Sequence, residues 1–112
     1  MPAETEYRDE SHTPTRAEID AGQGPVLLEF GTAWCGHCRA IALRVAELLE
    51  RYPDVKHVKV EDGPGRLLGR SFEVRLWPNF VFVRDGKVVR QLARPSHATL
   101  EEAFVALTSV AV

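Results

Sequence analysis

The feature that most constrains the fold is a change of hydrophobic period in the first half of the chain. Residues 25–32 form a compact run that is mostly apolar on both sides, as in a strand covered on two faces. Residues 36–52 then repeat apolar side chains at helical spacing until Pro53, and residues 55–61 alternate again. A strand, a helix and a second strand in this order predict a βαβ unit with two parallel strands.

The clearest local signal lies in residues 79–93. Two alternating, β-rich runs flank Asp85 and Gly86, which have the composition of a two-residue hairpin turn. We therefore expect an antiparallel hairpin beside the parallel pair.

Three further helices are predicted at 13–22, 66–72 and 96–110. Thr13 and Ser96 are the expected N-caps, because a side-chain oxygen there accepts an N–H of the first turn. Together these elements predict an α/β fold with one mixed sheet of about four strands, helices on both faces and an extra N-terminal helix. We expect a flexible tail over residues 1–13 and one domain over residues 14–112.

Composition narrows the classes of function. The chain has 112 residues, of which 45% are hydrophobic, so one domain can build its own core. Fourteen basic and sixteen acidic residues leave a net charge of −2, which does not favour nucleic acid or anionic lipid as a partner. The N-terminal residues have neither the basic nor the apolar segment of a secretory signal, so we expect a soluble, cytoplasmic protein. We also expect it to be a monomer.

The only two cysteines, Cys35 and Cys38, lie where the first strand gives way to the helix. Residues three apart share a helix face, and a disulfide between them closes a very small loop that stabilises the fold little. At the start of a helix, unpaired N–H groups favour a thiolate and lower the pKa of a thiol. We therefore expect Cys35 to attack a substrate disulfide and Cys38, one turn further in, to resolve the mixed disulfide.

A structural zinc site is the main alternative for a pair of cysteines. Such a site needs four ligands, and His12, His57 and His97 do not have the spacing of ligands. We expect no metal and no organic cofactor. His37, between the cysteines, is expected to stabilise the thiolate when its imidazole is cationic.

The segment VLLEFGTAWCGHC, residues 26–38, resembles the active-site segment of the thioredoxin family, and its Cys-Gly-His-Cys centre is similar to that of protein disulfide isomerase domains. The resemblance runs from Val26 to the C-terminal helix. It implies the thioredoxin fold and thiol–disulfide oxidoreductase activity in cell redox homeostasis, with Gly36 and His37 tuning the redox centre.

Other positions take roles from the same resemblance. Trp34 would flank the site, and Pro78 would be a cis-proline facing the disulfide. Trp77 would offer backbone groups to an extended substrate strand, and Ala93 would lie beside that strand where the family has a glycine.

Glu29 matches the family's buried acid beneath the resolving cysteine, and Lys59 matches a lysine that pairs with that acid. A carboxylate in an apolar strand is expected to have a raised pKa and to take the proton of Cys38. The alternative is that Glu29 and Lys59 form a structural pair only. Gly31 departs from the family, which commonly has an aromatic residue at this position.

The function expected from these residues is the reduction of protein disulfides by a Cys35–Cys38 cycle. Partners would be disulfide-containing proteins and an upstream redox protein such as a thioredoxin reductase. Two alternatives stay open: a disulfide oxidant or isomerase in an oxidising compartment, and a binding module that has the same fold but no catalysis.

Overall fold

A computed structural model describes residues 3–109. Residues 1–2 of the expected tail and residues 110–112 of the expected domain lie outside this range. The helices and strands follow the order η1 (Glu10–His12), α1 (Arg16–Ala21), β1 (Pro25–Gly31), α2 (Gly36–Arg51), β2 (Lys56–Glu61), α3 (Leu67–Ser71), β3 (Asn79–Arg84), β4 (Lys87–Ala93) and α4 (His97–Thr108).

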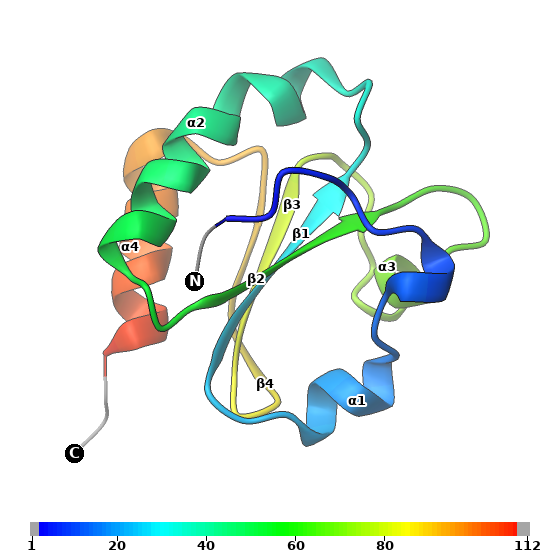
Figure 1. Cartoon of the computed structure of the whole chain (residues 1–112), viewed down its shortest axis with the longest axis horizontal. Coiled ribbons are helices and arrows are strands. Elements are labelled where there is room, and N and C mark those ends of the chain that lie inside the picture. The colour runs from blue at the N-terminus through cyan, green and yellow to red at the C-terminus, as the bar shows by residue number, and fades with distance from the viewer. Residues whose placement is uncertain (1–2, 110–112) are drawn as a thin grey trace.

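The strands form one mixed sheet in the order β2-β1-β3-β4 (Figure 1). β1 pairs in parallel with β2 and antiparallel with β3, while β3 and β4 form the antiparallel hairpin. The predicted βαβ unit and hairpin are both confirmed. β1 therefore lies inside the sheet, and the segment that follows it starts from a buried, fixed strand.

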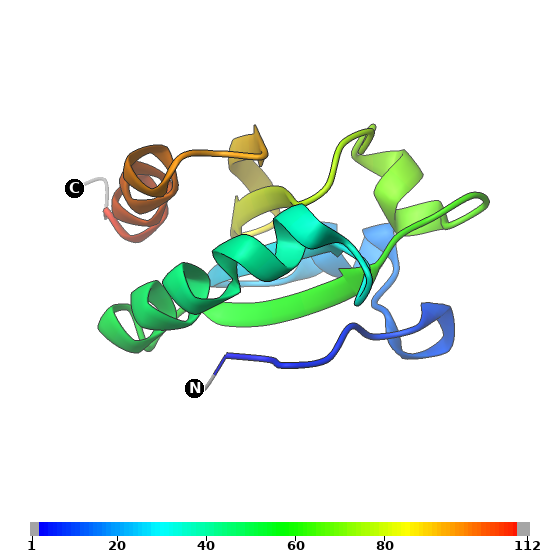
Figure 2. The same ribbon diagram turned by 90° about the horizontal axis from the view of Figure 1, so that it is seen from above.

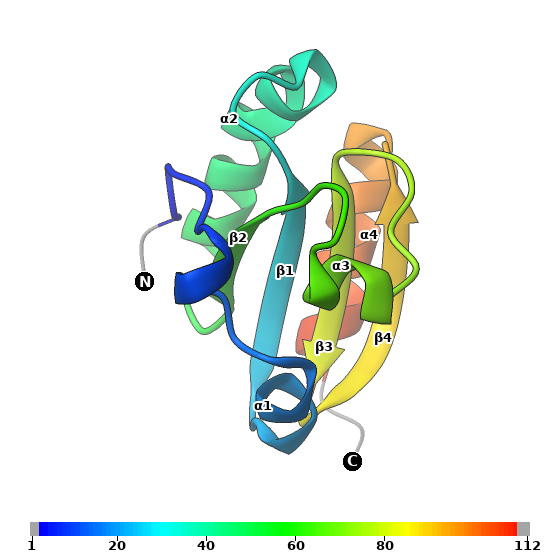
Figure 3. The same ribbon diagram turned by 90° about the vertical axis from the view of Figure 1, so that its right-hand side faces the viewer.

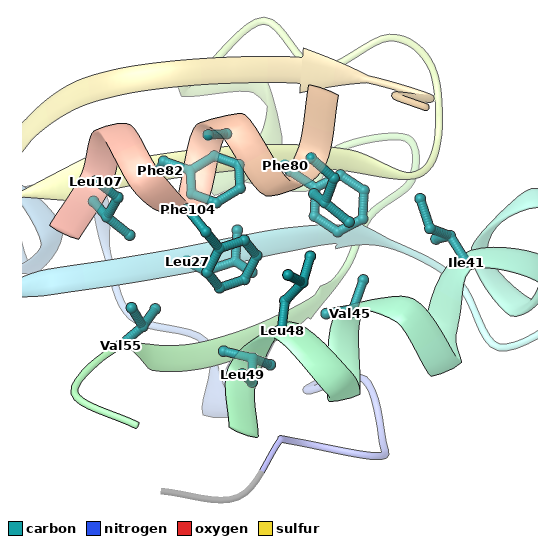
Figure 4. Close-up of a cluster of buried hydrophobic side chains, with 12 residues drawn as sticks. Leu27, Ile41, Val45, Leu48, Leu49, Val55, Phe80, Phe82, Phe104 and Leu107 are labelled. Carbon is teal, nitrogen blue, oxygen red and sulfur yellow. The ribbon is translucent and has the colours of Figure 1, made fainter. Parts of the chain in front are cut away.

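Helices cover both faces of the sheet, as predicted. α2 and α4 pack on one face around Leu27 and the phenylalanines of β3, as Figure 4 shows. α1 and α3 cover the other face, where Leu28 and Phe30 join a second apolar cluster. Two opposite faces of β1 thus enter two cores, which explains why residues 25–32 are apolar on both sides.

The N-terminal helix begins two residues later than predicted. Thr15 is its N-cap instead of Thr13, because the Thr15 side chain accepts the N–H of Glu18 while the Glu18 carboxylate accepts the N–H of Thr15. This reciprocal capping box satisfies two unpaired donors of the first turn. Ser96 caps α4 as predicted.

Residues 3–9, the N-terminal arm, contact the domain in ways that the expected tail does not include. The arm lies along the outer edge of β2 in Figures 2 and 3. The N–H of Arg8 donates to the carbonyl of Lys59 at 2.8 Å, and the N–H of Glu61 donates to the carbonyl of Arg8 at 3.0 Å. The physical reason is that β2 is an edge strand whose free backbone groups need partners. The predicted boundary at residue 14 stays a prediction.

Candidate redox site

The two cysteines lie at the start of α2, directly after the loop that follows β1. Cys35 is the N-cap of the helix, and its Sγ accepts a hydrogen bond from the backbone N–H of Cys38 at 3.2 Å. Both thiols are free. A sulfur in this position faces unpaired N–H groups and the positive end of the helix dipole, which together favour a thiolate.

The cysteines differ in burial in the predicted order. Cys35 keeps 7% of its surface exposed and Cys38 only 2%. Burial raises the pKa of the Cys38 thiol to about 11, and the hydrogen bond with Cys35 adds to this rise, whereas hydrogen bonds from the Thr32 backbone and the Tyr7 side chain act against it. Cys38 is therefore a protonated thiol at neutral pH and must lose a proton before it can attack.

Two tryptophans flank this helix start. The rings of Trp34 and Trp77 meet edge to face with centroids 5.6 Å apart, and Trp34 is 75% exposed. The indole N–H of Trp77 donates to Asp62 at 2.9 Å. Asp62 in turn packs so closely against Gly69 of α3 that any Cβ there would overlap its carboxylate. Asp62, which packs against α3, thus fixes the indole of Trp77, and the indole of Trp77 contacts that of Trp34.

The Trp77–Pro78 peptide bond is cis, and Pro78 is buried directly before β3. Ala93, the last residue of β4, is exposed and is the register partner of Asn79, the residue after Pro78. The strand ends therefore bring Pro78 and Ala93 to the same end of the sheet. Their contact with a substrate stays a prediction.

Arg94 makes hydrogen bonds to Trp77, whose backbone is expected to contact substrate, and to Pro78. Its side-chain Nε donates to the carbonyl of Trp77 at 2.6 Å, and its backbone N–H donates to the carbonyl of Pro78 at 2.9 Å. The Arg94 side chain therefore takes one of the two acceptor positions of the Trp77 carbonyl.

The buried acid has a different partner from the one expected. Glu29 and His57 are both nine-tenths or more buried, and Glu29 Oε1 lies 2.8 Å from His57 Nε2. Lys59 is the register neighbour of Glu29 on β2, yet residues 3–109 show no ion pair between the two. The Lys59 ammonium instead lies 4.3 Å from the centre of the Tyr7 ring. The expected Glu29–Lys59 pair is therefore replaced by a Glu29–His57 pair. His57 and Lys59 lie two residues apart on β2 and share one face of the strand, and the imidazole is the group that contacts Glu29.

Tyr7 of the N-terminal arm lies in the space left by the missing side chain of Gly31. A Cβ on Gly31 would stand 3.0 Å from the Tyr7 hydroxyl and 2.5 Å from Cys38 Sγ. Burial raises the pKa of Tyr7, and the negative charge of Glu29 raises it further, so the phenol keeps its proton. A cavity of about 560 Å³ lies beside it, lined among others by Cys38, Arg39 and Lys59.

His37 is exposed and lines a smaller cavity of about 200 Å³ together with Ile41, Pro78 and Arg94. Within residues 3–109, no hydrogen bond links it to Cys35, and its tuning role, like that of Gly36, stays a prediction. The same part of the chain has no group of three or more metal-ligating side chains, and none of its helices is long and apolar enough to cross a membrane.

Four residues of the site were not predicted from the sequence: Tyr7, His57, Asp62 and Arg94. The sequence did contain a signal for two of them, His57 and Tyr7. His57 lies two residues before Lys59 in an alternating strand, so it shares the face that the parallel register turns toward Glu29. Gly31, in place of an aromatic residue, indicated space that another side chain had to fill.

Comparisons with known proteins agree with this arrangement. A family model described as thioredoxin matches residues 8–106. The solved structure of thioredoxin 2 from Pseudomonas aeruginosa PAO1 in its reduced form is 55% identical, with a TM-score of 0.80 over 93% of this chain and 95% of that chain. Thioredoxin F from spinach chloroplast, in its short form, is 28% identical with a TM-score of 0.78 over 96% of both chains.

Curated relatives give a similar result. An H-type thioredoxin of Picea mariana is 31% identical over 77% of this chain and 69% of its own length. A thioredoxin of Aspergillus fumigatus is 39% identical over 57% of this chain and 59% of its own length. The match thus spans between 59% and 69% of the length of these two relatives.

Proposed function

This chain belongs to the thioredoxin family of thiol–disulfide oxidoreductases, and we propose that it reduces disulfide bonds in other proteins through the Cys35–Cys38 pair. The observation that carries the proposal is the hydrogen bond from the Cys38 N–H to Cys35 Sγ at the first turn of α2. It stabilises negative charge on the sulfur of Cys35, which is the more exposed residue of the pair.

The cycle has two exchange steps. The Cys35 thiolate attacks one sulfur of the substrate disulfide, a bond forms between them, and the other substrate sulfur leaves with the electron pair as a thiolate. Cys38 then attacks Cys35, the Cys35–Cys38 bond forms, and the substrate sulfur leaves as the second thiolate. Both thiolates take up protons, so the substrate disulfide is reduced to two thiols while the protein is oxidised to its disulfide.

The second step needs a proton acceptor, because the raised pKa of Cys38 keeps its thiol protonated at neutral pH. Glu29 supports this role. It is buried on β1, and its Oε2 has no hydrogen-bond partner in the described part of the chain. An unpaired buried carboxylate oxygen is costly in a fold and is often retained for chemistry.

Substrates would be extended segments of disulfide-containing proteins that lie against Trp34, Trp77, Pro78 and Ala93. The reduced pair would be regenerated by an upstream redox protein such as a thioredoxin reductase, and the protein would act as a cytoplasmic monomer. Arg94 would leave the Trp77 carbonyl as the substrate strand binds.

Turnover of insulin disulfides with dithiothreitol as the electron source tests the proposal. We expect activity in the wild-type protein, loss of activity in Cys35→Ser, and a trapped mixed disulfide in Cys38→Ser that mass spectrometry detects. Folded wild-type protein without turnover would exclude the reductase and leave a binding module, whereas full turnover in Cys35→Ser would exclude Cys35 as the attacking cysteine. The reduction potential measured against glutathione then separates a reductase, near or below the cytosolic value, from an oxidant far above it.

A further inference from the structure

The N-terminal arm makes a hydrogen bond that reaches the redox site through β2. The backbone N–H of Glu4 donates to His57 Nδ1 at 2.9 Å. The arm is also fixed at this point by its own side chains, because Glu4 Oε1 accepts the N–H of Lys59 at 3.0 Å and the Arg8 guanidinium pairs with the same carboxylate. The backbone N–H of Glu4 therefore contacts His57, while its side-chain carboxylate is fixed by Lys59 and Arg8.

This hydrogen bond decides the tautomer of His57. A backbone N–H can only donate, so Nδ1 has to accept and carries no proton. The proton of the neutral imidazole then lies on Nε2, which donates to Glu29 Oε1 at 2.8 Å. The chain of donors runs in one direction, from Glu4 through His57 to Glu29.

The result is a carboxylate with two different oxygens. Oε1 of Glu29 is held by His57, whereas Oε2 has no partner in residues 3–109. A hydrogen bond to Oε1 holds the carboxylate in place without using the oxygen that is free to take a proton.

We propose that His57 is a positioning residue of the resolving step, which holds Glu29 by Oε1 so that Oε2 accepts the proton of Cys38, and that the N-terminal arm fixes His57 in the required tautomer. This inference rests on the proposed function of Glu29 as the proton acceptor. In the step, the Cys38 S–H bond breaks, its proton goes to Glu29 Oε2, and the sulfur electron pair forms the bond to Cys35 as the substrate thiolate leaves.

The two exchange steps can be timed separately with a chromogenic aromatic disulfide. It releases one coloured thiolate when Cys35 attacks and a second when Cys38 resolves the mixed disulfide, so a stopped-flow trace has two phases. Glu29→Gln is expected to slow the second phase by on the order of a hundredfold and to leave the first phase unchanged.

His57→Val removes the donor to Glu29, and His57→Gln keeps an N–H on a side chain of similar reach. We expect the second phase to slow about tenfold in His57→Val and to recover most of its rate in His57→Gln, since a hydrogen bond to a charged group is lost in the first and kept in the second. Because Cys38 ionises without help as the pH approaches 11, the gap between His57→Val and wild type should close there, whereas a purely structural defect would persist at every pH.

Other groups that titrate or carry charge surround this site. They come from the arm, from the N-cap and first turn of α2 and from β2, and are unchanged in the His57 variants: Glu4, Glu6, Tyr7, Arg8, Cys35, Arg39, Lys59 and Glu61. A difference between the pH profiles of these variants and wild type therefore reports His57.

The role of the arm is tested at Glu4 with two variants that both lose the carboxylate. Glu4→Ala keeps the backbone N–H, and Glu4→Pro lacks it. We expect a slower second phase in Glu4→Pro than in Glu4→Ala. Long-range ¹H–¹⁵N spectra of the wild type should show His57 with its proton on Nε2 only, with exposed His12 as the comparison within the molecule.

The outcomes separate the two claims. If Glu29→Gln resolves as fast as wild type, the proton acceptor in the proposed function is wrong. If Glu29→Gln is slow while His57→Val matches wild type at neutral pH, or if His57 carries its proton on Nδ1, the proposed function stands and this inference is overturned. Equal rates in Glu4→Pro and Glu4→Ala would remove the arm from the mechanism.

Discussion

Gly31 shows how one residue without a side chain shapes the redox site. It ends β1 opposite Cys38, and the space that a larger residue would occupy holds the phenol of Tyr7. The aromatic ring beside the resolving cysteine therefore comes from the N-terminal arm instead of from β1. Packing at this point is tight, because one added carbon would meet both the sulfur and the hydroxyl.

Gly31→Ala adds only one methyl group, yet this group should disturb Cys38 strongly. The new Cβ would stand 2.5 Å from Cys38 Sγ, so the thiol or the strand must move. We expect a loss of stability of about 1–3 kcal/mol in urea unfolding, as for other overpacked cores, together with a slower resolving phase. Gly36→Ala, where a Cβ meets nothing within 4 Å, is the control for stability. Equal stability of the two variants would contradict the tight packing of Gly31 against Cys38 and Tyr7.

At this scale the sequence predicted the residues whose signal is local. The spacing of Cys35 and Cys38 and their place before a helix were sufficient to predict both the pair and the greater burial of Cys38. The partner of Glu29 was not predicted, because Lys59 and His57 share one face of β2 and spacing does not say which of the two buried side chains contacts the carboxylate. Tyr7 lies 31 positions before Cys38, and no periodicity links the two.

At the scale of elements, the β3–β4 hairpin is fixed at its turn as well as along its ladder. Asp85 and Gly86 both have positive φ, 51° and 79°, as a two-residue turn of the predicted kind requires. The Asp85 carboxylate accepts the N–H of Gly24 at 2.8 Å, and Gly86 packs directly on the backbone of Asp20. The turn thereby joins the hairpin to the end of α1 and to the loop between α1 and β1.

Gly86→Ala tests this docking with a matched control. Gly65 has the same φ of 79°, but a Cβ there meets nothing within 4 Å, whereas a Cβ on Gly86 would overlap the Asp20 carbonyl. Gly65→Ala should cost about 1–2 kcal/mol, the strain of a left-handed residue alone. Gly86→Ala should cost at least about 1 kcal/mol more in urea unfolding, because steric overlap is added. Similar losses in the two variants would mean that the turn is not docked.

Most elements followed from periodicity, and the differences have local causes. β1, α2, β2 and the hairpin match their predicted ranges to within a few residues. The N-terminal helix starts later than predicted, since Thr13 and Thr15 are both possible caps and only Thr15 has Glu18 three residues ahead. The arm along β2 gave no signal, because a single bridge at Arg8 produces no alternating pattern.

At the scale of the whole molecule, the redox site is tied to global stability through Cys38. The thiol is 2% exposed between the sheet and α2, so the folded protein favours its neutral form. An unfolded chain releases the same proton at an ordinary pKa. The free energy of unfolding of the reduced protein therefore depends on pH through this group.

The free energy of unfolding of the reduced protein should fall as the pH rises through the alkaline range. The pKa of Cys38 rises from 9.0 to about 11 on folding, so its contribution to stability is present below about pH 9 and is lost as the pH rises toward 11. We expect the urea midpoint of the reduced wild type to fall between about pH 8 and pH 10.5 by more than that of Cys38→Ala, which lacks the titrating thiol but keeps Tyr7 and the remaining basic groups. Cys38→Ala has a lower midpoint throughout, because it leaves a cavity, so the comparison is between the slopes with pH. Parallel slopes would mean that the Cys38 thiol ionises as easily in the folded protein as in the unfolded chain, and its pKa would then not be raised by folding.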